Sequence, residues 1–100
     1  MMKYIITESQ LSKFVRRYLN SLEINVSRED DDFWITNMEG RAIFYYYVGD
    51  KKRNLNIDPD IWSTVRGMFG LDDLRARMEI LFWFEDKFDR RVDEVYIWWD

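Results

Sequence analysis

The chain has 100 residues, no Cys and no His, and its 15 Lys and Arg against 19 Asp and Glu give a formal net charge of −4. Without Cys and His the chain has no disulfide, thiolate zinc site, imidazole metal ligand, cysteine nucleophile or Ser-His-Asp triad. The length, together with a hydrophobic content of 47%, predicts one folded domain over residues 1–100 and excludes a disordered chain.

The first 22 residues predict a strand followed by a helix. Residues 3–6 have the composition of a short strand, and Thr7 and Gln10 fit a capping box at the start of the helix. Over residues 8–22 the apolar side chains recur at helical spacing, which predicts an amphipathic helix. The apolar positions are Leu11, Phe14, Val15, Tyr18, Leu19 and Leu22.

The middle of the chain predicts a series of short strands joined by polar turns. In chain order the segments are a strand at 24–26, an acidic loop at 28–32, strands at 33–37 and 41–48, a basic turn at 49–53 and a strand at 54–57. Glu39 and Gly40 form the turn between the two longer strands, so we expect these strands to pair as a hairpin.

The last part of the chain predicts two helices and a closing strand. Asp58 and Pro59 match the N-cap and the first position of one helix, which ends at Gly70 as a C-terminal cap. A longer helix over residues 72–89, with its first residue as the N-cap, precedes a strand over residues 94–98.

The predicted order of elements is β-α-β-β-(β)-α-α-β, which places the domain in the α+β class. Without the additional elements the order is βαββαβ, that of the ferredoxin-like split βαβ sandwich. A meander in which the terminal strands pair is the alternative arrangement. In either case the helices pack on one face of a sheet.

Four segments of the chain resemble small uncharacterised proteins of tailed phages. These segments are residues 3–11, 68–72, 83–88 and 92–96, which together make up 25 of the 100 residues. They consist of a strand, cap and helix start near the beginning and a helix and strand near the end. The resemblance implies a phage or phage-like origin, and it carries over no activity and no functional residue.

The longer predicted helix is apolar around most of its circumference, because residues 78–84 include a single charged side chain. Such a helix is buried on several sides or forms an interface, and Trp is enriched in interface cores. We therefore expect a protein-binding or self-association surface. Its expected residues are Trp83, Phe84, Trp98 and Trp99. The alternative is that the sheet and helices of the same chain bury all four side chains.

The tyrosine-rich strand at 41–48 supports a second hypothesis, binding of single-stranded nucleic acid. Alternation places Tyr45 and Tyr47 on one face, as in domains that stack bases on aromatic side chains. The residues of this alternative site are Arg41, Tyr45, Tyr47, Lys51, Lys52 and Arg53. Against it, six positive and eight negative side chains in the first fifty residues, and nine and eleven in the rest, leave neither half basic.

The Asp and Glu side chains suggest a third hypothesis, that the protein is a metal-dependent enzyme. The acidic run at 30–32 lacks the ligand spacing of an EF-hand and is expected to be a solvated loop. Glu85 and Lys87 have the Glu-x-Lys spacing found in metal-dependent nucleases. In those enzymes the Glu and the Lys lie on a strand. Here they fall on a predicted helix, where residues two apart do not share a face. We therefore expect no catalytic residue, no metal site and no cofactor.

The sequence contains no apolar segment of the roughly 20 residues that a membrane helix needs, and residues 1–6 are shorter than a signal-peptide core. We therefore expect a cytoplasmic protein, located in the host cytoplasm if a phage encodes it. The expected function is that of a small non-catalytic interaction module that binds a host or phage protein or a second copy of itself.

Overall fold

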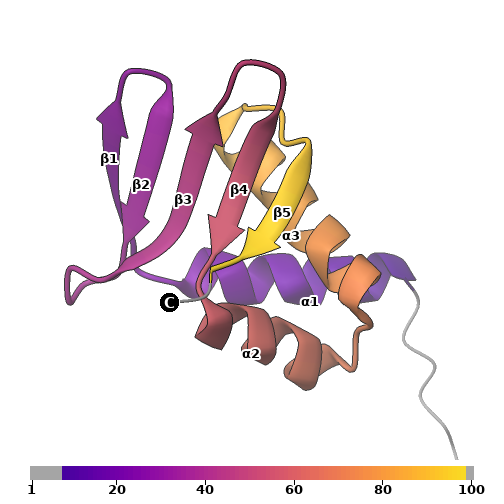
Figure 1. Cartoon of the computed structure of the whole chain (residues 1–100). Coiled ribbons are helices and arrows are strands. Elements are labelled where there is room, and N and C mark those ends of the chain that lie inside the picture. The colour runs from indigo at the N-terminus through magenta and orange to yellow at the C-terminus, as the bar shows by residue number, and fades with distance from the viewer. Residues whose placement is uncertain (1–7, 99–100) are drawn as a thin grey trace, which may run out of the picture.

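The computed structural model describes residues 8–98, which form three helices and five strands (Figure 1). In chain order the elements are α1 (Glu8–Ser21), β1 (Asn25–Glu29), β2 (Asp32–Thr36), β3 (Ala42–Val48), β4 (Arg53–Ile57), α2 (Pro59–Phe69), α3 (Asp73–Phe88) and β5 (Glu94–Ile97). The α+β class predicted from the sequence is confirmed. The predicted strand at 3–6 lies outside the described residues.

The five strands form one mixed sheet in the order β1-β2-β3-β4-β5. β1 to β4 pair antiparallel as a meander, and β5 returns parallel to β4 after a crossover through α2 and α3. The ferredoxin-like arrangement is therefore wrong. In a split βαβ fold, another strand lies between the two strands that a helical crossover joins. Here the crossover joins β4 and β5, which are direct neighbours, and short turns keep β1 to β4 side by side.

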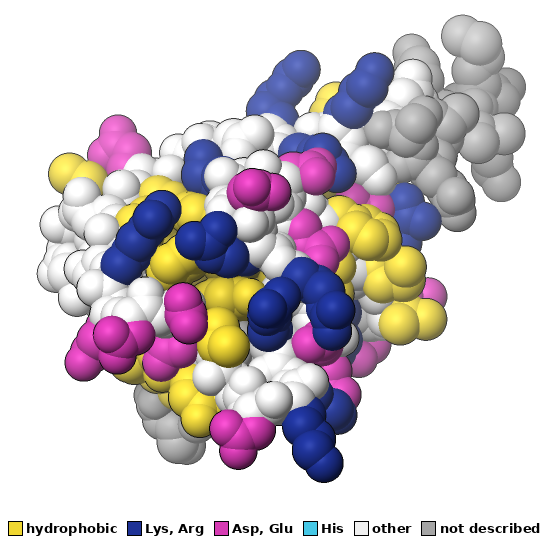
Figure 2. All heavy atoms as spheres, turned by 90° about the horizontal axis from the view of Figure 1, so that it is seen from above, with side chains coloured by type: hydrophobic (Ala, Val, Ile, Leu, Met, Phe, Trp, Pro, Cys, Tyr) yellow, Lys and Arg dark blue, Asp and Glu magenta, His cyan; other side chains and the backbone are white. Residues whose placement is uncertain are grey.

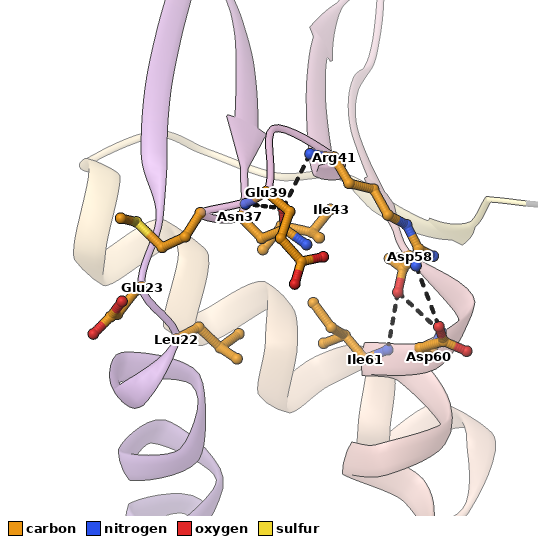
Figure 3. Close-up of a pocket in the computed structure, with 10 residues that line it drawn as sticks. Leu22, Glu23, Asn37, Glu39, Arg41, Ile43, Asp58, Asp60 and Ile61 are labelled. Carbon is orange, nitrogen blue, oxygen red and sulfur yellow. Dashed lines mark hydrogen bonds and ion pairs between the residues drawn. The ribbon is translucent and has the colours of Figure 1, made fainter.

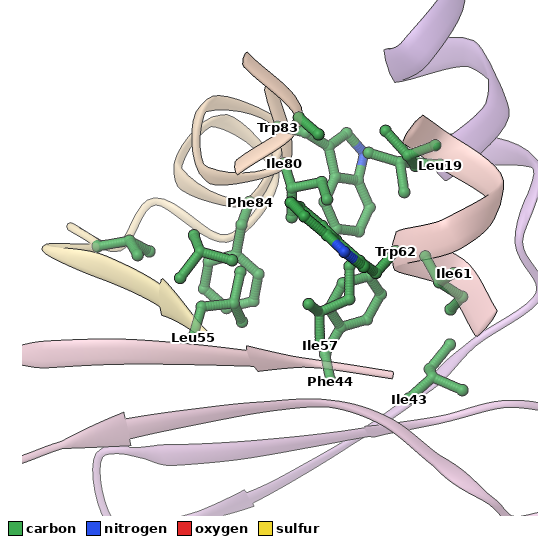
Figure 4. Packing of buried hydrophobic residues seen from close by; sticks show 14 of the residues in the cluster. Leu19, Ile43, Phe44, Leu55, Ile57, Ile61, Trp62, Ile80, Trp83 and Phe84 are labelled. Carbon is green, nitrogen blue, oxygen red and sulfur yellow. The ribbon is translucent and has the colours of Figure 1, made fainter. Parts of the chain in front are cut away.

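Side chains alternate between the two faces of the sheet. On the inner face, which the three helices cover (Figure 4), one row of register partners runs across β2 to β5 and is buried. This inner row consists of Phe33, Tyr46, Leu55 and Val95. The adjacent row points to the opposite face, which we call the open face. This open row consists of Trp34, Tyr45, Asn56 and Tyr96.

Aromatic rings occupy the centre of the core between the sheet and the helices (Figure 4). The ring of Phe84 stacks on that of Tyr46 with 5.2 Å between centroids, and Trp83 lies 5.4 Å from Phe44. The indole N–H of Trp83 donates to the side-chain oxygen of Asn20 on α1 at 2.8 Å, so this buried donor is satisfied. α3 thus packs against β3 and α1 at once.

The helix ends follow the predicted capping residues. The Asp58 carboxylate accepts the backbone N–H groups of Asp60 and Ile61 at 3.1 and 3.3 Å, and Gly70 ends α2 with a φ of 61°. Asp72 caps α3 by accepting a backbone N–H, also as predicted. These caps fix the start of each helix in the crossover between β4 and β5.

The acidic segment at 28–32 differs from the predicted solvated loop. Glu29 and Asp32 are register partners in β1 and β2, which leaves only Asp30 and Asp31 as the turn. Asp30 adopts a φ of 55°, a left-handed conformation that Asp tolerates better than most residues. Cross-strand pairing extends both strands because it satisfies backbone groups that a longer loop would leave to water.

Candidate functional site

Aromatic side chains form a continuous line on the open face of the sheet, and we call this line the aromatic row. It consists of Tyr47, Tyr45, Trp34 and Trp98. The ring centroids lie 6.1 Å apart for Tyr47 and Tyr45, 3.9 Å for Tyr45 and Trp34, and 6.0 Å for Trp34 and Trp98. Each ring therefore packs against its neighbours while one side remains available to solvent.

The strand register explains why these rings meet. Trp34 on β2 and Tyr45 on β3 are direct cross-strand partners, and aromatic pairs in such positions stabilise a sheet. Tyr47 is two residues further along β3 and so points to the same face. Trp98 follows β5, where its backbone N–H donates to the carbonyl of Ile57 at 2.8 Å and extends the ladder by one residue.

Hydrogen bonds hold the middle of the aromatic row in place. The Tyr45 hydroxyl donates to the Asp32 carboxylate at 3.2 Å, and the same carboxylate accepts the backbone N–H of Val48 at 3.0 Å. Burial, and then the negative charge of Asp32, raise the pKa of the Tyr45 phenol. Tyr45 is therefore a neutral, oriented ring at neutral pH.

A charged pair borders the open face at β5. The Lys52 ammonium lies 2.6 Å from the Glu94 carboxylate, which also accepts a hydrogen bond from the Tyr96 hydroxyl. The hydrogen bond from Lys52, followed by that from Tyr96, lowers the pKa of Glu94. The same contact with Glu94 raises the pKa of Lys52. Lys52 is thus already engaged by a carboxylate of its own chain.

The structure brings together only part of the predicted nucleic-acid site. Tyr45 and Tyr47 share the open face, and the basic turn with Lys51 lies next to them between β3 and β4. Arg41 lies before β3, at the other end of that strand, and forms ion pairs with Asp58 and with Asp60, the latter at 3.5 Å. Arg41 therefore does not belong to the same site as the basic turn.

The Arg41 ion pairs border a hollow of about 380 Å³ between the end of α1, the β2–β3 turn and the start of α2 (Figure 3). The Asn37 side-chain oxygen accepts the backbone N–H groups of Glu39 and Arg41, both at 3.0 Å, and so shapes the turn. Asp58 is buried here as the cap of α2. These polar groups are occupied in holding the turn and the helix start.

The predicted interaction surface does not form from the expected residues. Trp83 and Phe84 are 2% and 0% exposed, so their assignment to a surface is wrong. The helix is apolar on several sides because it packs against the sheet and α1. Trp98 is half-buried in the aromatic row, and Trp99 lies outside the described residues.

The carboxylate of Glu85, outside the open face, stabilises the fold. Glu85 accepts the backbone N–H of Val92 at 2.9 Å and so fixes the connection from α3 to β5. Glu85 and Lys87 lie on a helix, as predicted, rather than on a strand. Within residues 8–98, no group of three or more Asp or Glu side chains is placed to hold a metal ion.

Sequence reasoning missed two aromatic residues of the open face, Trp34 and Tyr96. The signal for Trp34 was present, because it alternates with the apolar Phe33 and Ile35 in a predicted strand. Tyr96 could have been found in the same way from its apolar neighbours in β5. What the sequence did not supply was the strand order that places both in one row.

No protein-family model, curated protein or solved structure matches this chain. In the described part of the chain, no helix is long and apolar enough to cross a membrane.

Proposed function

We propose that this protein is a non-catalytic interaction module that binds a protein partner on the open face of its sheet. One observation carries the proposal: the aromatic row lies on the face that the helices leave free. Tyr47, at its end, is 45% exposed, although a Tyr side chain of the neighbouring inner row is fully buried. Tyr and Trp are the residue types most enriched in the cores of protein interfaces.

The charges around the aromatic row favour a protein over a nucleic acid. The carboxylate of Asp32 borders the row on β2 and would repel phosphate groups. Lys52 is neutralised by Glu94, which removes one of the cations on which the nucleic-acid hypothesis depended. A partner segment that carries Lys or Arg fits this surface, because those side chains bind carboxylates and stack on aromatic rings.

Binding of single-stranded nucleic acid is the second candidate. The rings of Tyr45 and Tyr47 are only 21° from parallel, an arrangement on which consecutive bases can stack. Lys51 lies in the turn that follows Tyr47, and no ion pair engages its side chain in the described part of the chain. Arg53 of the predicted site is the register partner of Val48, so it points to the inner face and does not join this stack. This candidate requires binding that weakens steeply with added salt.

Tagged protein recovered from cells of its source, with and without nuclease, tests the two candidates. We expect a discrete protein to be retained after nuclease treatment and to be lost with the double variant Tyr45→Ala/Tyr47→Ala. The matched control is Met78→Ala/Phe82→Ala, which removes side chains of α3 that are 41% and 42% exposed and should leave capture unchanged. Loss of all captured material with nuclease would replace the protein partner with nucleic acid.

Direct titration completes the test of the second candidate. Tryptophan fluorescence reports on the open face because Trp34 and Trp98 both belong to the aromatic row. Single-stranded oligonucleotides are expected to leave this fluorescence unchanged at physiological salt. A change that saturates, and that disappears in the Tyr45→Ala/Tyr47→Ala variant, would contradict the protein-binding proposal.

The resemblance to tailed-phage proteins supports the further proposal that a phage encodes the chain. The module would then act in the host cytoplasm on a host or phage protein. Sequencing the DNA on both sides of the gene tests this origin. We expect phage structural genes nearby, and a position among unrelated chromosomal genes would contradict it.

A further inference from the structure

A second site lies at the end of the molecule where the β1–β2 turn, the β3–β4 turn and the connection from α3 to β5 meet (Figure 1). A hollow of about 190 Å³ opens there, which we call the arginine hollow. Its polar lining consists of Arg53, Arg90, Arg91, Asp31, Asp89 and the phenol of Tyr46. Seen from this end, Lys and Arg side chains gather around a hydrophobic area, with acidic side chains among them (Figure 2).

Several guanidinium groups of this region lie near the same pair of aromatic rings. That of Arg90 lies 5.2 Å from the centre of the Phe33 ring, and that of Arg28 lies 4.8 Å from the same ring. Burial raises the pKa of the Tyr46 phenol, and the positive charges of Arg53 and Arg90 oppose that rise. Two guanidinium groups are thus near the Tyr46 ring, and two are near the Phe33 ring that packs against it at 5.5 Å.

Within residues 8–98, most of these cations lack a carboxylate partner, although Arg91 pairs with Asp93 and Arg90 donates a hydrogen bond to the carbonyl of Asp89 at 3.1 Å. Among the described residues, no ion pair engages the side chain of Arg28, Arg53 or Arg90. This contrasts with Arg41, which contacts two carboxylates. Asp31 and Asp89 line the arginine hollow, yet neither forms an ion pair with its guanidinium groups in the described part of the chain. A bound anion would supply the charged partner that the Arg53 and Arg90 guanidinium groups lack among the described residues.

The backbone around the arginine hollow is held rigidly. The Tyr46 hydroxyl donates to the carbonyl of Arg91 at 2.7 Å. The Asp93 carboxylate accepts the backbone N–H of Arg53 at 2.8 Å and binds the Arg91 guanidinium at 3.0 Å. These bonds join β3, β4 and the segment before β5, so the backbone that carries the arginines is fixed.

We propose that the arginine hollow binds a phosphate group, either as free phosphate or as the monoester of a small molecule. Arg side chains bind phosphate oxygens through several parallel N–H donors, and a rigid cluster loses little entropy on binding. The Phe33 ring provides an apolar contact for the Arg90 guanidinium. Asp31 and Asp89 weaken the attraction and allow the ligand to exchange. This site is separate from the aromatic row and does not depend on the function proposed for it.

Isothermal titration with inorganic phosphate, at an ionic strength held constant with sodium chloride, tests the proposal. We expect saturable binding that Arg53→Gln and Arg90→Gln each weaken by about tenfold or more, since one charge-assisted hydrogen bond is worth that factor. Arg17→Gln is the matched control, because Arg17 is an exposed arginine on α1, away from the arginine hollow. Its affinity for phosphate should equal that of the unmodified protein.

Removing a neighbouring negative charge provides a test in the opposite direction. Asp89→Asn keeps a residue type that tolerates the left-handed φ of 52° at this position and should tighten phosphate binding severalfold. Absence of binding at millimolar phosphate, or equal weakening by Arg17→Gln and Arg90→Gln, would overturn the proposal. The Tyr45→Ala/Tyr47→Ala variant should bind phosphate normally, which separates this site from the open face.

A comparison of ligands identifies the source of the phosphate group. Ribose 5-phosphate that binds about tenfold more tightly than inorganic phosphate would indicate a small phosphorylated molecule as the ligand. Equal affinities would indicate free phosphate. Binding of neither compound would contradict the proposed site.

Discussion

The inner and open rows of the sheet lie one residue apart on the same four strands, yet their side chains have different roles. Tyr46 on the inner row is fully buried and stacks on Phe84, whereas Tyr45 on the open row packs against Trp34 and borders solvent. Both rows are rich in aromatic side chains, so composition does not distinguish them. The difference shows that a ring in this protein stabilises the fold or serves a surface according to strand register.

The hydroxyl groups of the two tyrosines show the same contrast. The hydroxyl of Tyr46 donates to the backbone carbonyl of Arg91. A buried phenol needs such an acceptor, because an unsatisfied donor would cost free energy. The hydroxyl of Tyr45 donates to the carboxylate of Asp32 at the border of the open face. The inner bond joins two parts of the fold, and the outer bond orients a ring on the open face.

Phe84→Ala should produce the largest loss of stability. The side chain is fully buried among aromatic rings, so we expect the free energy of unfolding to fall by about 3–5 kcal/mol in urea denaturation. Phe82→Ala on the same helix is the control, since Phe82 is 42% exposed and should cost less than about 1 kcal/mol. Equal losses would contradict the packing of α3 described above.

Asp58→Ala tests the polar contacts that Asp58 makes at the start of α2. The substitution removes the cap of α2 and leaves Arg41 without its buried partner, so we expect a loss of about 1–2 kcal/mol in the same measurement. Asp60 lies two residues away, but its side chain is exposed, and its ion pair with Arg41 is long, at 3.5 Å. Asp60→Ala should therefore change stability by less than about 0.5 kcal/mol, and a larger effect there would show that Asp58 is not the main anchor.

Tyr47→Ala separates stability from binding. Tyr47 is 45% exposed and lies at the end of the aromatic row, so its removal should lower the free energy of unfolding by less than about 1 kcal/mol. The same substitution should greatly reduce capture of the protein partner. A large loss of stability with intact capture would reverse the roles assigned to the two rows.

The smallest effect is a pH dependence at Glu94. Lys52 and Tyr96 lower the folded-state pKa of its carboxyl below the ordinary 4.5, so its contribution to stability is present above that value. The contribution is lost as the pH falls through the folded-state pKa. Lys52→Gln should raise the pKa of Glu94 toward 4.5 in a carbon-detected NMR titration. An unchanged pKa would show that the ion pair does not persist in solution.

Much of the fold was predictable because local signals agreed with one another. Apolar spacing predicted α1, and the caps at Asp58, Gly70 and Asp72 predicted the bounds of α2 and the start of α3. Strand order was not predictable, since the same element order fits both a split βαβ sheet and a meander. The pairing of β5 with β4 sets the observed order, and that contact joins segments far apart in the sequence.

The candidate surface was predicted only in part. Alternation correctly placed Tyr45 and Tyr47 on one face, because a strand has a fixed period of two. Trp83 and Phe84 were assigned to a surface because residues 80–84 are apolar around the whole helix, so the sequence shows no side that faces away from the core. The sequence did not indicate how much of α3 the sheet and α1 would cover.

The position of β5 in the chain has a consequence for synthesis on the ribosome. The meander of β1 to β4 leaves the exit tunnel before α3, so its inner row is exposed to water until that helix arrives. A nascent chain stopped after Ile57 would present aromatic side chains and an unpaired β4 edge, the features that promote aggregation. The crossover that adds β5 therefore covers the β4 edge and ends the interval in which the nascent chain exposes it.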